Sequence, residues 1–157
     1  MKQQSAAEVL VNDDFRAIFY GKFYGVLRWH QLDHIWDMVK RDIEAGWYCY
    51  EIGKTPPLSL TQGEEMVVFL DQLDQKLRET HAEDYCAVAY VDDLDQPSFI
   101  KVFDPKSMGT SCSIATSGPL PEWVICKILP QDISDKEFSD VKPVKFKKSW
   151  LGNLFGK

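Results

Sequence analysis

Short apolar runs separated only by brief turns fill the second half of the sequence, and this spacing constrains the fold most. We expect strands at 85–91, 98–103 and 122–129, with a possible further strand at 111–116. Antiparallel strands join through short turns, whereas a parallel pair needs a crossover of about a dozen residues or more. The spacing therefore predicts strands that pair as hairpins and meanders in a mostly antiparallel sheet.

Helical patterns precede these strands, with one strand between them at 47–52. We expect helices at about 13–24, 26–45 and 62–80. The middle helix has the clearest apolar stripe, with side chains three and four positions apart at Trp29, Leu32, Trp36, Val39 and Ile43. Gly46 is placed to end that helix. Thr61 and Glu64 have the spacing of a capping box at the start of the next one.

Helices followed by closely spaced strands predict an α+β fold, with N-terminal helices packed on one face of a mostly antiparallel sheet of four to five strands. The chain of 157 residues is about one domain long. At this length a hydrophobic core needs no disulfide or metal ion to hold it together. We expect a single domain over 1–140 and a separate tail over 141–157.

Charge divides the chain at the same place. The whole sequence has 18 Lys and Arg against 24 Asp and Glu, a net charge of −6. Residues 141–157 hold five lysines and no acid, so the tail is +5 and the preceding part is −11. An acidic body disfavours a nucleic-acid binder, which needs a basic surface to neutralise phosphates.

The basic tail is the candidate partner-binding segment. It combines lysines with apolar and aromatic side chains, at Lys145, Lys147, Lys148, Trp150, Leu151, Leu154 and Phe155. Such a segment suits a partner's groove or an anionic membrane surface. Docking on its own acidic domain and a frayed end remain open alternatives. No run approaches the roughly 20 apolar residues of a membrane span.

Cysteine usage indicates a reducing compartment. Cys49, Cys86 and Cys126 lie among apolar residues, and no Cys-x-x-Cys pair occurs. We interpret these three as reduced core residues and expect a cytoplasmic protein, since Met1 to Phe15 does not resemble a secretory signal. Two disulfides in a secreted protein are the alternative.

A polar loop supplies the candidate ligand-binding residues, which are Gly109, Thr110, Ser111, Cys112 and Ser113. The loop lacks the last glycine of a nucleophile elbow and the Gly-Lys of a P-loop. Its backbone N–H groups are suited to hold an anion. Cys112 becomes a reactive thiol only if a neighbouring base lowers its pKa.

Two further patterns resemble metal sites and depart from them. His30 and His34 share one side of a helix, but Gln31 stands where a zinc protease has its catalytic glutamate. The acidic turn from Asp92 to Asp95 lacks the glycine of a calcium loop. We therefore expect no metal and no cofactor, although a metal site built on the two histidines stays as a hypothesis.

A tandem Phe-Tyr-Gly repeat at 19–21 and 23–25 has a period of four. On a helix this period would place identical residues next to each other, Phe19 beside Phe23 and Tyr20 beside Tyr24. The repeat therefore indicates either core packing at a helix break or an aromatic groove for a ligand or a partner peptide.

No catalytic motif emerges from these patterns. The leading hypothesis is a small cytosolic accessory or protein-interaction domain without catalytic activity, whose oligomeric state the sequence leaves open. The alternative is a small-molecule or anion-binding protein that uses the loop at 104–121, with a reactive thiol at Cys112.

Overall fold

The computed structural model describes residues 14–106 and 120–133, and within them the chain forms an antiparallel five-stranded sheet. Its strands are β1 (Tyr24–Arg28), β2 (Tyr48–Glu51), β3 (Tyr85–Val91), β4 (Phe99–Val102) and β5 (Trp123–Cys126). They lie in the order β1-β3-β4-β5-β2, so β4 is central and β1 and β2 form the edges. The predicted α+β fold with an antiparallel sheet is confirmed.

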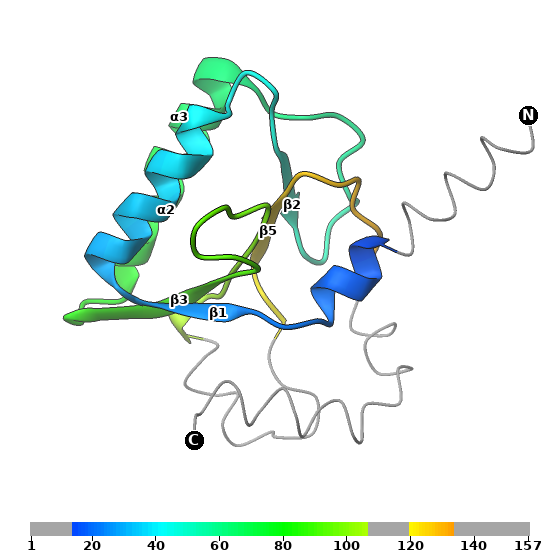
Figure 1. Ribbon diagram of the computed structural model, residues 1–157. Helices are drawn as coiled ribbons and strands as arrows, with labels where there is room; N and C mark the ends of the chain where they lie inside the picture. The colour runs from blue at the N-terminus through cyan, green and yellow to red at the C-terminus, as the bar shows by residue number, and fades with distance from the viewer. Residues whose placement is uncertain (1–13, 107–119, 134–157) are drawn as a thin grey trace, which may run out of the picture.

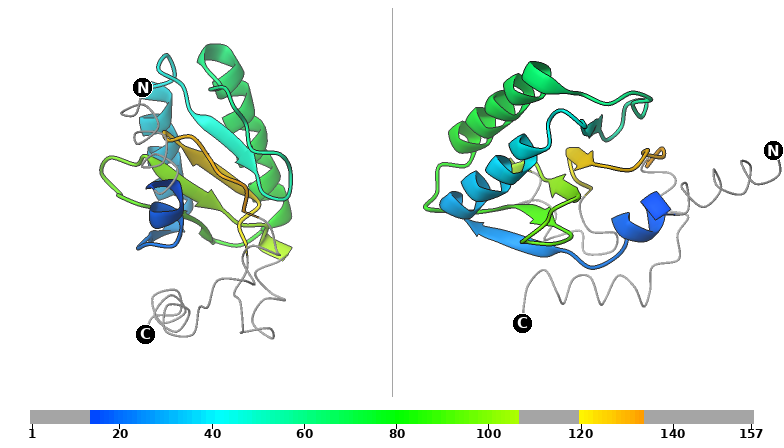
Figure 2. Two further views of the ribbon diagram at one scale, coloured as in Figure 1. Left: turned by 90° about the vertical axis from the view of Figure 1, so that its right-hand side faces the viewer. Right: turned by 45° about the horizontal axis from the view of Figure 1, so that its top comes forward.

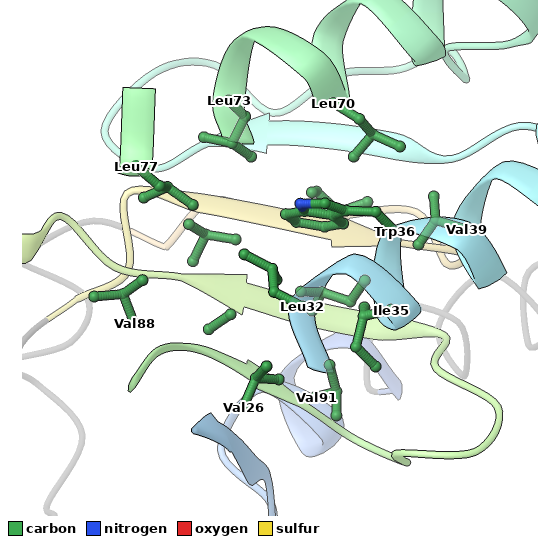
Figure 3. Close-up of a cluster of buried hydrophobic side chains, with 14 of the residues drawn as sticks. Val26, Leu32, Ile35, Trp36, Val39, Leu70, Leu73, Leu77, Val88 and Val91 are labelled. Carbon is green, nitrogen blue, oxygen red and sulfur yellow. The ribbon is translucent and has the colours of Figure 1, made fainter. Parts of the chain in front are cut away.

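Two helices, α2 (Trp29–Arg41) and α3 (Gly63–Thr80), cover one face of this sheet (Figure 1). Figure 2 shows them side by side. Their inward residues recur three and four positions apart, which places them on one helix face. They are Leu32, Ile35, Trp36 and Val39 on α2 and Met66, Leu70, Leu73 and Leu77 on α3. Figure 3 shows Trp36 between the helices and the sheet, so this layer forms the main core.

A second, aromatic core occupies the other face of the sheet. Because side chains alternate along a strand, Ile100 of β4 belongs to the helix-covered core, whereas the preceding Phe99 points to the opposite side. A short helix at 14–19 packs there through Phe15 and Phe19. The ring centroids of Phe15 and Phe99 lie 5.3 Å apart. Aromatic side chains from the chain's beginning therefore cover the middle of the sheet.

The predicted helices at 13–24 and 26–45 are wrong over their shared boundary. The first ends after residue 19, and α2 begins only at Trp29. Between them Tyr24–Arg28 forms β1, which pairs with β3. Gly21 and Gly25 weaken a helix in this region, and pairing with a central strand outweighs the remaining helix propensity. The stacking of like residues on a helix, which the tandem repeat predicted, does not occur.

The other predicted elements are close to those observed. The strand predicted at 85–91 has the bounds of β3, and the strands predicted at 47–52, 98–103 and 122–129 correspond to β2, β4 and β5. The possible strand at 111–116 lies outside the described residues. The helix predicted at 62–80 is α3, but Thr61 does not cap it, because its backbone pairs with Trp47 instead.

Candidate functional site

Strand β1 leaves one of its edges unpaired within the described part of the chain, and apolar side chains are exposed along it. Leu27 is 60% exposed and Tyr24 is 42% exposed. Tyr85, whose Cα lies opposite Arg28 in the sheet, is 48% exposed. We call Tyr24, Leu27 and Tyr85 the β1 edge surface.

A chain of ring contacts continues from this surface toward α3. The Tyr85 ring lies 5.2 Å from His81, and His81 lies 6.0 Å from Trp29. The guanidinium of Arg78 stands 4.7 Å above the Trp29 ring and is held by Asp74 and Asp33. Tyrosine, tryptophan and arginine are the residues that dominate binding energy at protein interfaces. The β1 edge surface is therefore continuous with a row of aromatic and arginine side chains.

The segment that contains β1 has a charge opposite to that of the whole chain. Residues 15–32 contain Arg16, Lys22 and Arg28 and no acid, although the sequence as a whole carries a net charge of −6. Lys22 and Arg28 are exposed next to the β1 edge surface. The exposed acids Glu83 and Asp84 precede Tyr85, so the basic character belongs to the β1 segment and not to the whole surface.

A second unusual feature lies at the centre of the sheet, where Lys101 of β4 is only 4% exposed. Its ammonium nitrogen stands 4.4 Å from the centre of the Phe19 ring and 4.1 Å from that of Phe23. In the described residues no carboxylate or hydrogen-bond acceptor lies within bonding distance of this nitrogen. Burial lowers the pKa of Lys101 to about 7.

The surroundings of Lys101 are apolar and aromatic. Its cross-strand neighbours are Tyr90 on β3 and Val124 on β5, and Gly25 and Tyr50 extend the same row on β1 and β2. Burial raises the pKa of Tyr90 to about 12, so its hydroxyl stays neutral near pH 7. We call Lys101, Phe19, Phe23, Phe99 and Tyr90 the Lys101 cluster.

The tandem Phe-Tyr-Gly repeat supplies this cluster, although not in the predicted way. Phe19 ends the short helix and Phe23 precedes β1, and both rings converge on Lys101 and Phe99. Lys101 is not among the candidate site residues expected from the sequence. A lysine at the centre of the apolar run Phe99–Phe103 is the signal that indicates it, because a central strand with both faces covered buries such a side chain almost completely.

The three cysteines in the described residues are free thiols in the core. Cys86 and Cys126 are buried and Cys49 is half-buried. Burial raises the pKa of Cys49 to about 11 and that of Cys126 to about 12, and it also raises the pKa of Cys86. These thiols are poor nucleophiles at neutral pH, as expected for core residues.

The metal-like patterns have ordinary structural explanations. His30 and His34 are exposed on α2, and no group of three or more potential ligands gathers among residues 14–106 and 120–133. In the acidic turn, the Asp92 carboxylate accepts hydrogen bonds from the Ser98 and Phe99 amides. Asp93 accepts from the Asp95 and Gln96 amides. These carboxylates stabilise the hairpin between β3 and β4.

Both of the sites predicted from sequence lie outside the described residues. These are the loop Gly109–Ser113 and the tail from Lys145 to Phe155. A scan of family models, a search of curated proteins and a search of solved structures each found no match. Within the described residues, no helix is long and apolar enough to cross a membrane.

Proposed function

We propose that the protein is a small cytoplasmic accessory domain that binds another protein and has no catalytic activity of its own. The observation that carries this proposal is the exposed, apolar edge at β1, whose own segment is basic. An open sheet edge with outward apolar side chains favours pairing with a further strand unless the chain protects it. Three unpaired thiols in the described residues support a reducing compartment.

The binding mode that fits this edge is the addition of an extended segment from the partner. In this mode main-chain hydrogen bonds give affinity and alternate side chains give specificity. The Gln31 side chain already accepts hydrogen bonds from the Leu27 and Arg28 amides, at 3.1 and 2.9 Å. The added segment therefore pairs with the first half of β1, from Tyr24 to Val26.

Charge indicates what the segment contains. Lys22 stands 5.2 Å from the centre of the Tyr24 ring, beside the half of β1 that remains open, so an acidic residue of the added segment is attracted there and a basic one is repelled. Leu27, which lies on the same face of β1 as Gly25, then packs against apolar side chains that alternate with the acids. The partner we propose is thus a protein with an extended segment of alternating acidic and apolar residues.

The experiment places a photoreactive amino acid at Leu27 in the living cell, with Val68 as the matched control. Val68 is 47% exposed on α3, away from β1. We expect a protein crosslinked from position 27 and not from position 68. With that partner purified, Leu27→Glu should weaken binding by more than about tenfold and Val68→Glu should not. Equal binding by both variants would reject the β1 edge as the contact.

The basic tail remains a separate prediction for a partner contact. Deleting residues 142–157 abolishes recovery of a partner if the tail makes the contact, and leaves it unchanged if β1 alone does. Measured with the same purified partner, the tail deletion and Leu27→Glu separate the two surfaces.

The ligand-binding alternative has one supporting observation in the described residues. The loop at 104–121 begins directly after β4 and Phe103, close in sequence to the buried Lys101. Rapid labelling of Cys112 at neutral pH supports the reactive thiol, and an inert Cys112 rejects it. The Lys101 cluster itself points to a more definite ligand chemistry.

A further inference from the structure

The position of Lys101 makes an unpaired charge unexpected. It lies on β4, the central strand, and the residues beside it on the same face are Phe99, Val124 and Cys126. Valine or isoleucine would fill this position without any cost of removing a charge from water. The lysine is therefore a feature of the site that core packing alone does not explain.

The two phenylalanine rings compensate the charge only in part. A ring face attracts a cation through its quadrupole, and Lys101 lies within 4.4 Å of two ring centres. That attraction is smaller than the cost of burying an ammonium group, which normally requires an anionic partner. Lys127 shows the ordinary arrangement, because it lies 4.3 Å above Trp47 and also pairs with the Asp42 carboxylate. Among the residues that the structure describes, Lys101 has the ring contact without a carboxylate.

We propose that Lys101 is the anchor of a binding site for a small carboxylate with an aromatic or aliphatic body, and that residues 19–23 cover this site. The ligand's carboxylate pairs with Lys101 in the way that the Asp42 carboxylate pairs with Lys127. Its apolar body packs among the rings of the Lys101 cluster once Phe19 and Phe23 move aside. This site lies on the aromatic face of the sheet, whereas the proposed partner contact is the outer edge of β1.

A carboxylate fits these surroundings better than a phosphate. A phosphate carries more charge and needs several donors, whereas the described residues around Lys101 offer a single ammonium group among apolar rings. Gly21 lies between the two covering phenylalanines, just after the short helix ends. Glycine there allows the backbone to change direction as the rings move.

Binding of an anion at Lys101 is accompanied by a measurable uptake of protons. Burial leaves a large fraction of the amine neutral near pH 7, and a bound carboxylate favours the protonated form, so the complex takes up protons. The Asp132 carboxylate lies on the aromatic face, where it accepts a hydrogen bond from the Tyr50 hydroxyl at 3.4 Å. Tyr90, Tyr50 and Cys126 share this face, and burial raises the pKa of each of them. None of them changes charge near neutrality. Arg16 on the short helix is charged throughout and donates to the Asp132 carbonyl.

The experiment is calorimetric titration of the full chain with phenylacetate at pH 7.5, in two buffers of different ionisation enthalpy. We expect binding with net proton uptake. Lys101→Met should weaken it by more than about tenfold, whereas Lys101→Arg and the matched control Lys127→Met should change it by less than about threefold. Circular dichroism checks that each variant is folded.

Three results would overturn the proposal. The first is an absence of phenylacetate binding up to millimolar concentration. The second is equal binding of 2-phenylethanol, the uncharged analogue, which would mean apolar association only. The third is binding that Lys101→Met leaves unchanged or that takes up no proton. Because none of these measurements involves a protein partner, the proposed function and the carboxylate site can fail separately.

Discussion

Replacing Lys101 by methionine should stabilise the protein at neutral pH and leave its stability unchanged at high pH. Methionine has a similar length and no charge, so it fills the same apolar position beside Phe19 and Phe23 without the cost of desolvation. The substitution removes a group whose pKa burial lowers from 10.5 to about 7. This is a change of about 5 kcal/mol at 1.36 kcal/mol per pKa unit.

The direction of this pH dependence of stability follows from proton binding by the folded and unfolded chains. Above pH 10.5 the amine is neutral in both the folded and the unfolded chain, so its titration costs nothing. Between pH 10.5 and about 7 the unfolded chain binds a proton that the folded chain does not, and the stability of the native protein falls as the pH falls. Below about pH 7 both forms are charged, and the full penalty remains. The rings of Phe19 and Phe23 favour the cation and offset about 2 kcal/mol of it. About 3 kcal/mol remains.

The assay is urea denaturation of both proteins at several pH values from 6 to 10. The difference between them matters, because Tyr90 and Cys126 titrate at high pH in both proteins and cancel. We expect the Lys101→Met variant to be more stable by about 3 kcal/mol at pH 6, with the advantage reduced to about 1 kcal/mol or less at pH 10. Parallel stability curves, or a destabilised variant at pH 6, would show that Lys101 is not a buried uncompensated charge.

Three further predictions concern substitutions at Gly46, Ala87 and Asp92. Gly46→Ala should destabilise the fold by about 2–4 kcal/mol, because Gly46 has a φ of +91° and an added Cβ would lie 2.7 Å from Gln62 Cγ; a urea midpoint equal to wild type would contradict this. Ala87→Gly should raise stability by about 0.5–1 kcal/mol, since Ala87 has a φ of 56° within β3, and a lower melting temperature would count against the argument. Asp92→Ala should cost about 1–2 kcal/mol through the lost bonds to the Ser98 amide and hydroxyl, at 2.9 and 2.6 Å; unchanged chemical denaturation would show that the turn does not depend on them.

The sequence predicted the fold class and most of the elements because their patterns are local. The periodic apolar face of α3 and the apolar run of β3 each identify an element without knowledge of its neighbours. The strand β1 is different, because its five residues form a strand through pairing with β3. These residues were predicted to be helical because aromatic residues four positions apart, such as Phe19 and Phe23, are also typical of one helix face.

The Lys101 cluster was less accessible from sequence for the same reason. Its members lie far apart in the chain, and only the antiparallel register places Lys101 between Tyr90 and Val124. The phenylalanines that cover it were selected as an aromatic repeat, and the lysine itself was not. The β1 edge surface likewise depends on which strands lie at the edges of the sheet, and that order is a property of the whole fold.

Amide hydrogen exchange at β1, measured with and without the partner captured from position 27, shows whether a partner strand is added to this edge of the sheet. An added strand gives its hydrogen bonds to amides that otherwise face water. We expect slower exchange at Gly25, in the half of β1 that Gln31 does not cap, and no change along α3. Slower exchange confined to α3, or none at β1, would contradict the claim that this domain works by extending its sheet.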